Sequence, residues 1–142
     1  MRYLYLISGQ TGSGVHETIC LLRDIYRLRA SPSLYACAAY PQSETSPDIW
    51  RINPTALAAL NCFPSQQLPS YRLIYLHRPA FEREAALCKA GIPFPIALRH
   101  IVCDLYTFRG WKERMDLILE GGTPQACAAR LYAYILRNER PT

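Results

Sequence analysis

"RYLYLISGQTGSGVHET", residues Arg2 to Thr18, joins two patterns whose succession decides the fold. In its first part, from Arg2 to Ser8, apolar side chains occupy both alternating faces, as in a strand that is buried on both sides within a parallel sheet. Three glycines then interrupt the pattern, and from His16 to Ala30 apolar residues recur at helical spacing. The stretch therefore predicts a buried strand, a glycine loop and a helix, one directly after another.

The remainder of the chain continues this alternation. Further strands are expected at residues 34–40, 49–52 and 71–77, and helices at residues 54–60, 80–91, 95–106, 110–122 and 124–140. Residues 96–106 also fit a buried strand that ends in an acid, but Pro95 at a first helical turn favours the helix. We expect one α/β domain over residues 1–142, with a small, at least partly parallel sheet of three or four strands backed by helices and a helical C-terminal third.

Charge and hydropathy restrict the possible partners. The net charge is +5, and most of the excess lies in residues 71–142, which contain eleven basic and seven acidic residues. This bias is compatible with an acidic partner or a nucleic-acid backbone, but it is weaker than a basic tail or stripe. No apolar run approaches the roughly 18 residues of a membrane span, and no targeting segment is recognisable. We therefore expect a cytoplasmic protein that makes no membrane contact.

Cysteine and histidine spacing gives no support for a metal or cofactor site. The six cysteines lie far apart in mostly apolar surroundings, without a C-x-x-C pair, which predicts free thiols in a reducing compartment. The three histidines form no pair at the i, i+4 spacing of a helical metal site. No catalytic set emerges either, so the sequence favours a binding protein without a cofactor over an enzyme.

The glycine loop is the first candidate site. A strand before it, a helix after it and glycines at positions 9, 12 and 14 suit a turn whose backbone amides surround an anion at a helix N-terminus. In this respect the segment resembles the nucleotide-binding loop of P-loop NTPases over roughly the first 25 residues of the chain. It departs from that loop where the chemistry lies, because Val15 replaces the phosphate-binding Lys and His16 replaces the hydroxyl that holds Mg²⁺. The candidate ligand-binding residues are Gly9, Thr11, Gly12, Ser13, Gly14 and His16.

The C-terminal third supplies the second candidate site, an interface rich in Tyr, Trp and Arg. These residue types dominate interface hot spots and also form platforms for single-stranded nucleic acid. The candidate interface residues are Arg109, Trp111, Lys112, Arg114, Arg130, Tyr132, Tyr134 and Arg137. The favoured hypothesis is a small regulatory protein, an adaptor or inhibitor, that binds another protein or a second copy of itself as a homodimer. Two alternatives remain open: a degenerate P-loop-like domain that binds a phosphate-bearing ligand at Gly9–His16, and a basic accessory protein that binds nucleic acid.

Overall fold

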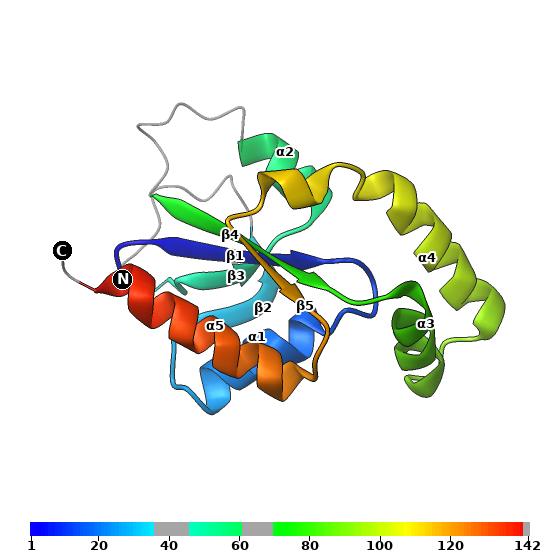
Figure 1. The fold of residues 1–142 in the computed structure, drawn as a ribbon, viewed down its shortest axis with the longest axis horizontal. Coiled ribbons are helices and arrows are strands. Elements are labelled where there is room, and N and C mark those ends of the chain that lie inside the picture. Colours follow the sequence, from blue (N-terminus) through cyan, green and yellow to red (C-terminus); the bar gives the residue numbers. More distant parts are fainter. Residues whose placement is uncertain (36–45, 61–69, 141–142) are drawn as a thin grey trace.

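The computed structural model describes residues 1–35, 46–60 and 70–140. The chain order of the elements is β1 (Leu4–Gly9), α1 (Val15–Asp24), β2 (Ala30–Leu34), β3 (Ile49–Arg51), α2 (Pro54–Leu60), β4 (Tyr71–His77), α3 (Ala80–Lys89), α4 (Phe94–Thr107), the 3-10 helix η2 (Trp111–Arg114), β5 (Leu117–Glu120) and α5 (Pro124–Glu139). Figure 1 shows the strands as one twisted sheet with helices on both of its faces. The expected α/β fold is therefore confirmed.

The sheet is fully parallel, with strand order β2-β3-β1-β4-β5. It has five strands, where the sequence predicted three or four. β1 lies at the centre and pairs with β3 on one side and β4 on the other, which explains why its side chains are apolar on both faces. The long, two-sided apolar pattern of Tyr71–His77 has the same cause, because β4 is also an interior strand.

Two apolar cores cover the two faces of the sheet. On one face, Tyr5 and Ile7 of β1 pack with apolar residues of α1 and α5, including Ile19 and Leu131. On the other face, Leu4 and Leu6 pack with side chains of α2 and with Trp111 of η2. The alternation of β1 side chains between these two cores fixes the strand between two layers of helices. Among the described residues, no helix is long and apolar enough to cross a membrane.

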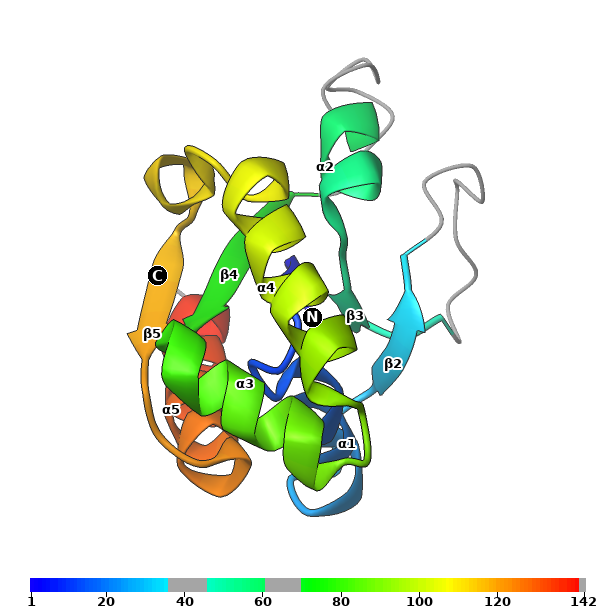
Figure 2. The same cartoon turned by 90° about the vertical axis from the view of Figure 1, so that its right-hand side faces the viewer.

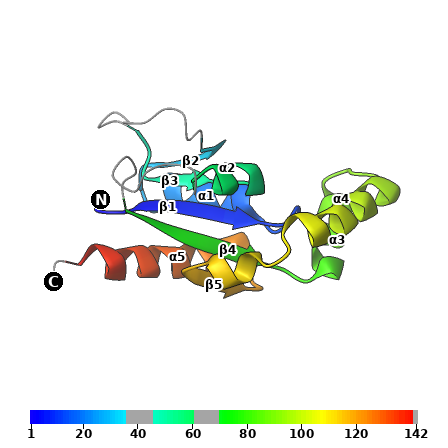
Figure 3. The ribbon, with the colours of Figure 1, turned by 90° about the horizontal axis from the view of Figure 1, so that it is seen from above.

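The helices α3 and α4 lie beyond the carboxyl ends of the strands and not on either face. Figure 2 shows this pair in front of the sheet edge, and Figure 3 shows it extending past the ends of β1 and β4. α4 confirms the helical interpretation of residues 96–106. Its position allows it to reach the loop that follows β1, as described below.

Three local predictions were wrong. The helix after the glycine loop ends at Asp24, not near Ala30, and Arg27 beyond it has a positive φ of 59° that no helix can continue through. Residues 31–33, which directly follow the expected helix, belong to β2, while most of the strand expected at 34–40 lies outside the described residues.

The third error concerns the helix expected at residues 110–122. Only a 3-10 turn forms there, and Leu117–Glu120 becomes β5, an edge strand paired with β4. Pairing along β4 satisfies its backbone groups and buries Leu119, and this tertiary gain outweighs a helical spacing of only two turns. The C-terminal third is therefore helical except for this strand.

Candidate functional site

The glycine loop makes a close turn from β1 into α1. Gly12 has φ of +85°, and a Cβ atom there would lie 2.8 Å from the carbonyl oxygen of Arg83. Gly14, with φ of +81°, occupies the N-cap position of α1. Both conformations favour glycine strongly, and at Gly12 a side chain would also collide with the α3 backbone. The glycines therefore set the path of the loop.

The N-terminus of α1 is open toward the pocket. Gly14 has no side chain with which to cap the helix, so no side-chain cap is made to its first turn. Backbone N–H groups of a first helical turn have no partner within the helix and carry partial positive charge. Ser13, next to them, is 4% exposed, and its Oγ has no hydrogen-bond partner among the described residues. A buried hydroxyl without a partner at a helix N-terminus is a polar group that a ligand could satisfy.

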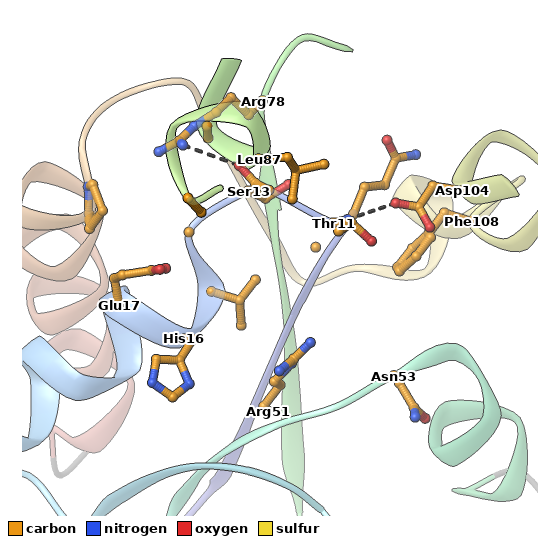
Figure 4. A pocket seen from close by; sticks show the side chains of 18 of the residues that line it. Thr11, Ser13, His16, Glu17, Arg51, Asn53, Arg78, Leu87, Asp104 and Phe108 are labelled. Atoms are coloured by element: carbon orange, nitrogen blue, oxygen red, sulfur yellow. Dashed lines mark hydrogen bonds between the residues drawn. The ribbon is translucent and has the colours of Figure 1, made fainter. Parts of the chain in front are cut away.

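Arg78 brings a cation to the same loop from the end of β4. Its Nη1 donates to the carbonyl oxygen of Gly12 at 3.2 Å and its Nη2 to that of Gly122 at 3.1 Å. The Nη2 atom would be 3.3 Å from a Cβ atom built on Gly14. Figure 4 shows Arg78 at the loop, above the start of α1. The guanidinium group therefore provides positive charge beside a loop whose sequence lacks the usual lysine.

The opposite wall of the pocket comes from the segment after β3. Arg51 ends that strand and is exposed, and Asn53 uses its Oδ1 to cap α2 by accepting from Ala56 N at 2.8 Å. Figure 4 shows Arg51 and Asn53 across the pocket from Thr11. Together with the loop, α3 and α4, they line an open cavity of about 820 Å³. Neighbouring strands β1 and β3 continue to helices on opposite faces of the sheet, and ligands of parallel α/β folds bind at such a point.

A buried ion pair attaches α3 and α4 to the loop. Asp104 of α4 accepts a hydrogen bond from Thr11 N at 2.7 Å, and its Oδ2 lies 3.8 Å from Nη1 of Arg83 on α3. Arg83 is 3% exposed and also donates from Nε to the carbonyl oxygen of Arg78. Burial lowers the pKa of Arg83, and the Asp104 carboxylate opposes this effect. The pair therefore holds α3 and α4 against the glycine loop.

The structure brings the predicted loop residues together and separates the predicted interface residues. Gly9, Thr11, Gly12, Ser13, Gly14 and His16 all line the cavity. In the second set, Trp111 is buried in the core on one face of the sheet, while Tyr132 and Tyr134 pack against the core on the other face. Arg109, Lys112 and Arg114 are exposed near Trp111, and Arg130 and Arg137 are exposed on α5. These basic residues therefore form two groups on different sides of the sheet, and the hypothesis of nucleic-acid binding stays a prediction.

Sequence reasoning missed the residues that reach the loop from elsewhere in the chain. Arg51, Arg78 and Arg83 were not among the candidates, and Asp104 was considered only as the end of a strand. The one available signal was that Arg51 lies at the end of one apolar strand segment and Arg78 directly follows another, since the carboxyl ends of parallel strands meet at one edge of the sheet.

The other titratable groups among the described residues form no second site. Burial, followed by the nearby charge of Lys112, lowers the pKa of His77 at the end of β4. Cys20, Cys88, Cys103 and Cys127 are free thiols, and Cys37 and Cys62 lie outside the described residues. Within the described part of the chain, no three His, Cys, Asp or Glu side chains are grouped as metal ligands would be.

Fold and site define an α/β protein with a five-stranded parallel sheet and a glycine loop between its central strand and first helix. No family model matches the chain, and no curated protein matches it. The fold is similar to that of an uncharacterized protein from Eubacterium ventriosum, at a TM-score of 0.63 and 14% identity over 97% of this chain and 99% of the other. It is also similar to TT1252 from Thermus thermophilus, at a TM-score of 0.54 and 10% identity over 99% and 100% of the two chains. Both likenesses concern the fold alone.

Proposed function

We propose that this protein binds a phosphate-bearing ligand in the cavity at the glycine loop. The observation that carries the proposal is the open N-terminus of α1 beside the buried Ser13 hydroxyl, which has no hydrogen-bond partner among the described residues. Backbone N–H groups at a helix N-terminus, a hydroxyl donor and a neighbouring guanidinium group are together the donor set that a phosphate group requires. The amides are fixed by the loop before a ligand arrives, so little ordering accompanies binding.

Arg78 is the proposed charge partner of the phosphate. An arginine offers two parallel N–H donors and keeps its charge at all physiological pH values, so it can replace the lysine that Val15 displaces. The cavity of about 820 Å³ is much larger than a phosphate group, which supports a ligand with an organic part. Val15 and His16 lack the groups that position a triphosphate and its Mg²⁺, so the proposal is one of binding without triphosphate hydrolysis.

The test is titration of the protein with inorganic phosphate, pyrophosphate and a set of nucleotides, followed by calorimetry and thermal unfolding. We expect at least one of these anions to bind and to raise the melting temperature. Arg78→Ala should weaken that binding about tenfold or more, since it removes a charge-assisted hydrogen bond, and Arg78→Lys should restore part of it.

Arg23→Ala is the control, because Arg23 lies on α1, the helix whose N-terminus forms the site, but is paired with Asp24 and is absent from the cavity lining. It should bind as the unaltered protein does. Ser13→Ala, which keeps the backbone amides, should weaken binding less than Arg78→Ala. Absence of binding by every anion, or equal loss in the Arg23 and Arg78 variants, would refute the proposal.

A further inference from the structure

The cavity at the glycine loop has an arginine on each of two flanks. β3 and β4 pair with β1 on its two sides, so Arg51 at the end of β3 and Arg78 after β4 approach the loop from opposite directions. Arg78 is held by the carbonyl oxygens of Gly12 and Gly122. Arg51 is exposed, and its side chain makes no hydrogen bond or ion pair among the described residues. The two guanidinium groups are therefore separate points of positive charge, and only the second is free of protein contacts.

Arg51 lies on the side of the sheet that α1 covers. Side chains of β3 alternate between the two cores, with Ile49 in the core shared with α1 and Trp50 against the opposite one, so Arg51 follows on the α1 side. Its partner in register, Ile7 of β1, belongs to the same core, and α1 itself packs against β3. Arg51 and His16, from the first turn of α1, both line the cavity (Figure 4). The free guanidinium group is therefore directed to the region where α1 begins.

The residues in this region do not suit a magnesium ion. In P-loop NTPases, which the loop resembles, a hydroxyl group at the position of His16 helps to hold Mg²⁺. A guanidinium group has no lone pair to offer a metal, and Mg²⁺ prefers oxygen ligands. Of the described carboxylates that line the cavity, Asp104 is engaged with Thr11 N and Arg83, which leaves Glu17. A single exposed carboxylate among basic side chains is a poor site for a divalent cation.

A chain of phosphate groups still requires positive charge on more than one side. The N–H groups at the start of α1 and the buried Ser13 hydroxyl can satisfy one phosphate group, with Arg78 as its charge partner. A second phosphate linked to the first adds negative charge, while Arg78 is fixed on the β4 side of the loop. On the β3 side, Arg51 has free N–H donors in a planar fork that matches two phosphate oxygens. Arg51 can therefore supply the charge that a metal ion supplies in other phosphate-binding loops.

We propose that the cavity binds a ligand with two linked phosphate groups, and that Arg51 binds the second of them in place of a divalent cation. This inference rests on the proposed phosphate site and names the class of its ligand. The cavity of about 820 Å³ has room for a diphosphate and an organic group, for which Leu87 and Phe108 supply apolar lining. Binding therefore does not depend on Mg²⁺.

Two matched pairs of probes test the inference by calorimetry, each in EDTA and in Mg²⁺: inorganic phosphate with pyrophosphate, and adenosine monophosphate with adenosine diphosphate. In EDTA we expect the diphosphate of a pair to bind about tenfold more tightly or better, because it gains a charge-assisted bidentate contact. Mg²⁺ should weaken its binding, since the ion competes with Arg51 for the same phosphate oxygens.

Variants of Arg51 separate the two phosphate positions. Arg51→Ala should lower the affinity for the diphosphates about tenfold or more and that for the monophosphates less than about threefold, while Arg51→Lys should restore part of the loss. Arg99→Ala is the matched control, because Arg99 is another exposed arginine but is absent from the cavity lining. It should leave all affinities unchanged. Thermal unfolding without ligand confirms that each variant is folded.

Failure of this inference is distinguishable from failure of the phosphate site. Absence of binding by all four probes and by every other nucleotide refutes both. A monophosphate that binds as tightly as its diphosphate, or an equal loss of both in Arg51→Ala, leaves the phosphate site in place and overturns the inference. Diphosphate binding that requires Mg²⁺ also overturns it, because a cation held by Glu17 would then do what is assigned to Arg51.

Discussion

α5 and α4 are helices of similar length and begin alike, with proline in the first turn, yet they are used in opposite ways. α5 lies along one face of the sheet and buries Cys127, Ala128, Leu131 and Ile135 against α1 and β1. α4 lies past the end of the sheet, and against the described residues only its inward side is buried. The difference shows that position relative to the sheet, and not apolar content, decides whether a helix here stabilises the core or presents a surface.

Each of the two helices is also tied to β1 or its loop by one carboxylate. Glu139 of α5 accepts hydrogen bonds from Arg2 N at 2.8 Å and from the Tyr5 hydroxyl at 2.9 Å, at the start of β1. Asp104 of α4 accepts from Thr11 N, just past the end of β1. The bonds to Glu139 fix α5 against the sheet, whereas the bond to Asp104 fixes the candidate binding loop. Substitutions in the two helices should therefore separate stability from binding.

The largest effect on stability is expected for Leu131→Ala in α5. Leu131 is fully buried between α5, α1 and the sheet, so truncation leaves a cavity and should lower the free energy of unfolding by about 2–5 kcal/mol. Urea denaturation measures the loss. Leu136→Ala on the same helix, at a position 49% exposed, should change the free energy by less than about 0.5 kcal/mol. Equal losses in the two variants would mean that α5 is not the buried layer described here.

Asp104→Asn should have the next largest effect on stability, and it should also loosen the glycine loop. The substitution removes the negative charge that faces buried Arg83 and weakens the bond to Thr11 N, so we expect a loss of about 1–3 kcal/mol. Hydrogen exchange of the Thr11 amide should become faster.

Asp116→Asn is the control for this prediction, because Asp116 also accepts from a backbone N–H, that of Leu73, at 2.7 Å but lies away from the cavity. It should lower stability without changing exchange at Thr11. Unchanged exchange at Thr11 in the Asp104 variant would show that α4 is not attached to the loop through this carboxylate.

The sequence predicted the elements that depend on neighbouring residues. It did not predict the elements that form only by pairing with a distant part of the chain. The two-sided apolar strands at Leu4–Gly9 and Tyr71–His77 follow from neighbouring residues alone. β5 could not be predicted in this way, because Leu117–Glu120 becomes a strand only by pairing with β4. The site divides similarly: the glycine loop is visible in the sequence, whereas Arg78 and Asp104 reach it only after the sheet has brought their segments together.

Glu139→Gln tests the anchor of α5 and should cost less, about 1–2 kcal/mol at neutral pH, since the carboxylate is only partly buried. Burial raises the pKa of Glu139, but hydrogen bonds from Arg2 N, the Tyr5 hydroxyl and Tyr3 N outweigh it, so the pKa lies below its usual value. A lowered native pKa means that the stabilisation is complete above the unfolded value, about 4.3, and disappears as the pH falls through the native value. Denaturation at pH 7 and at pH 3 should therefore show a smaller difference between variant and unaltered protein at the lower pH. A difference that stays constant between the two pH values would contradict this assignment.

The smallest effect on stability is expected at Leu105 of α4, which lies on the side of this helix that is not buried. Leu105 is 60% exposed on α4, so Leu105→Ala should change the free energy of unfolding by no more than about 0.5 kcal/mol. Ile101, one turn away on the same helix, is 6% exposed, and Ile101→Ala should cost about 2–4 kcal/mol. Urea denaturation of the pair compares two apolar truncations in one helix with different surroundings. If Leu105→Ala were as costly as Ile101→Ala, the outward side of α4 would already be covered within the folded protein, and the contrast with α5 would not hold.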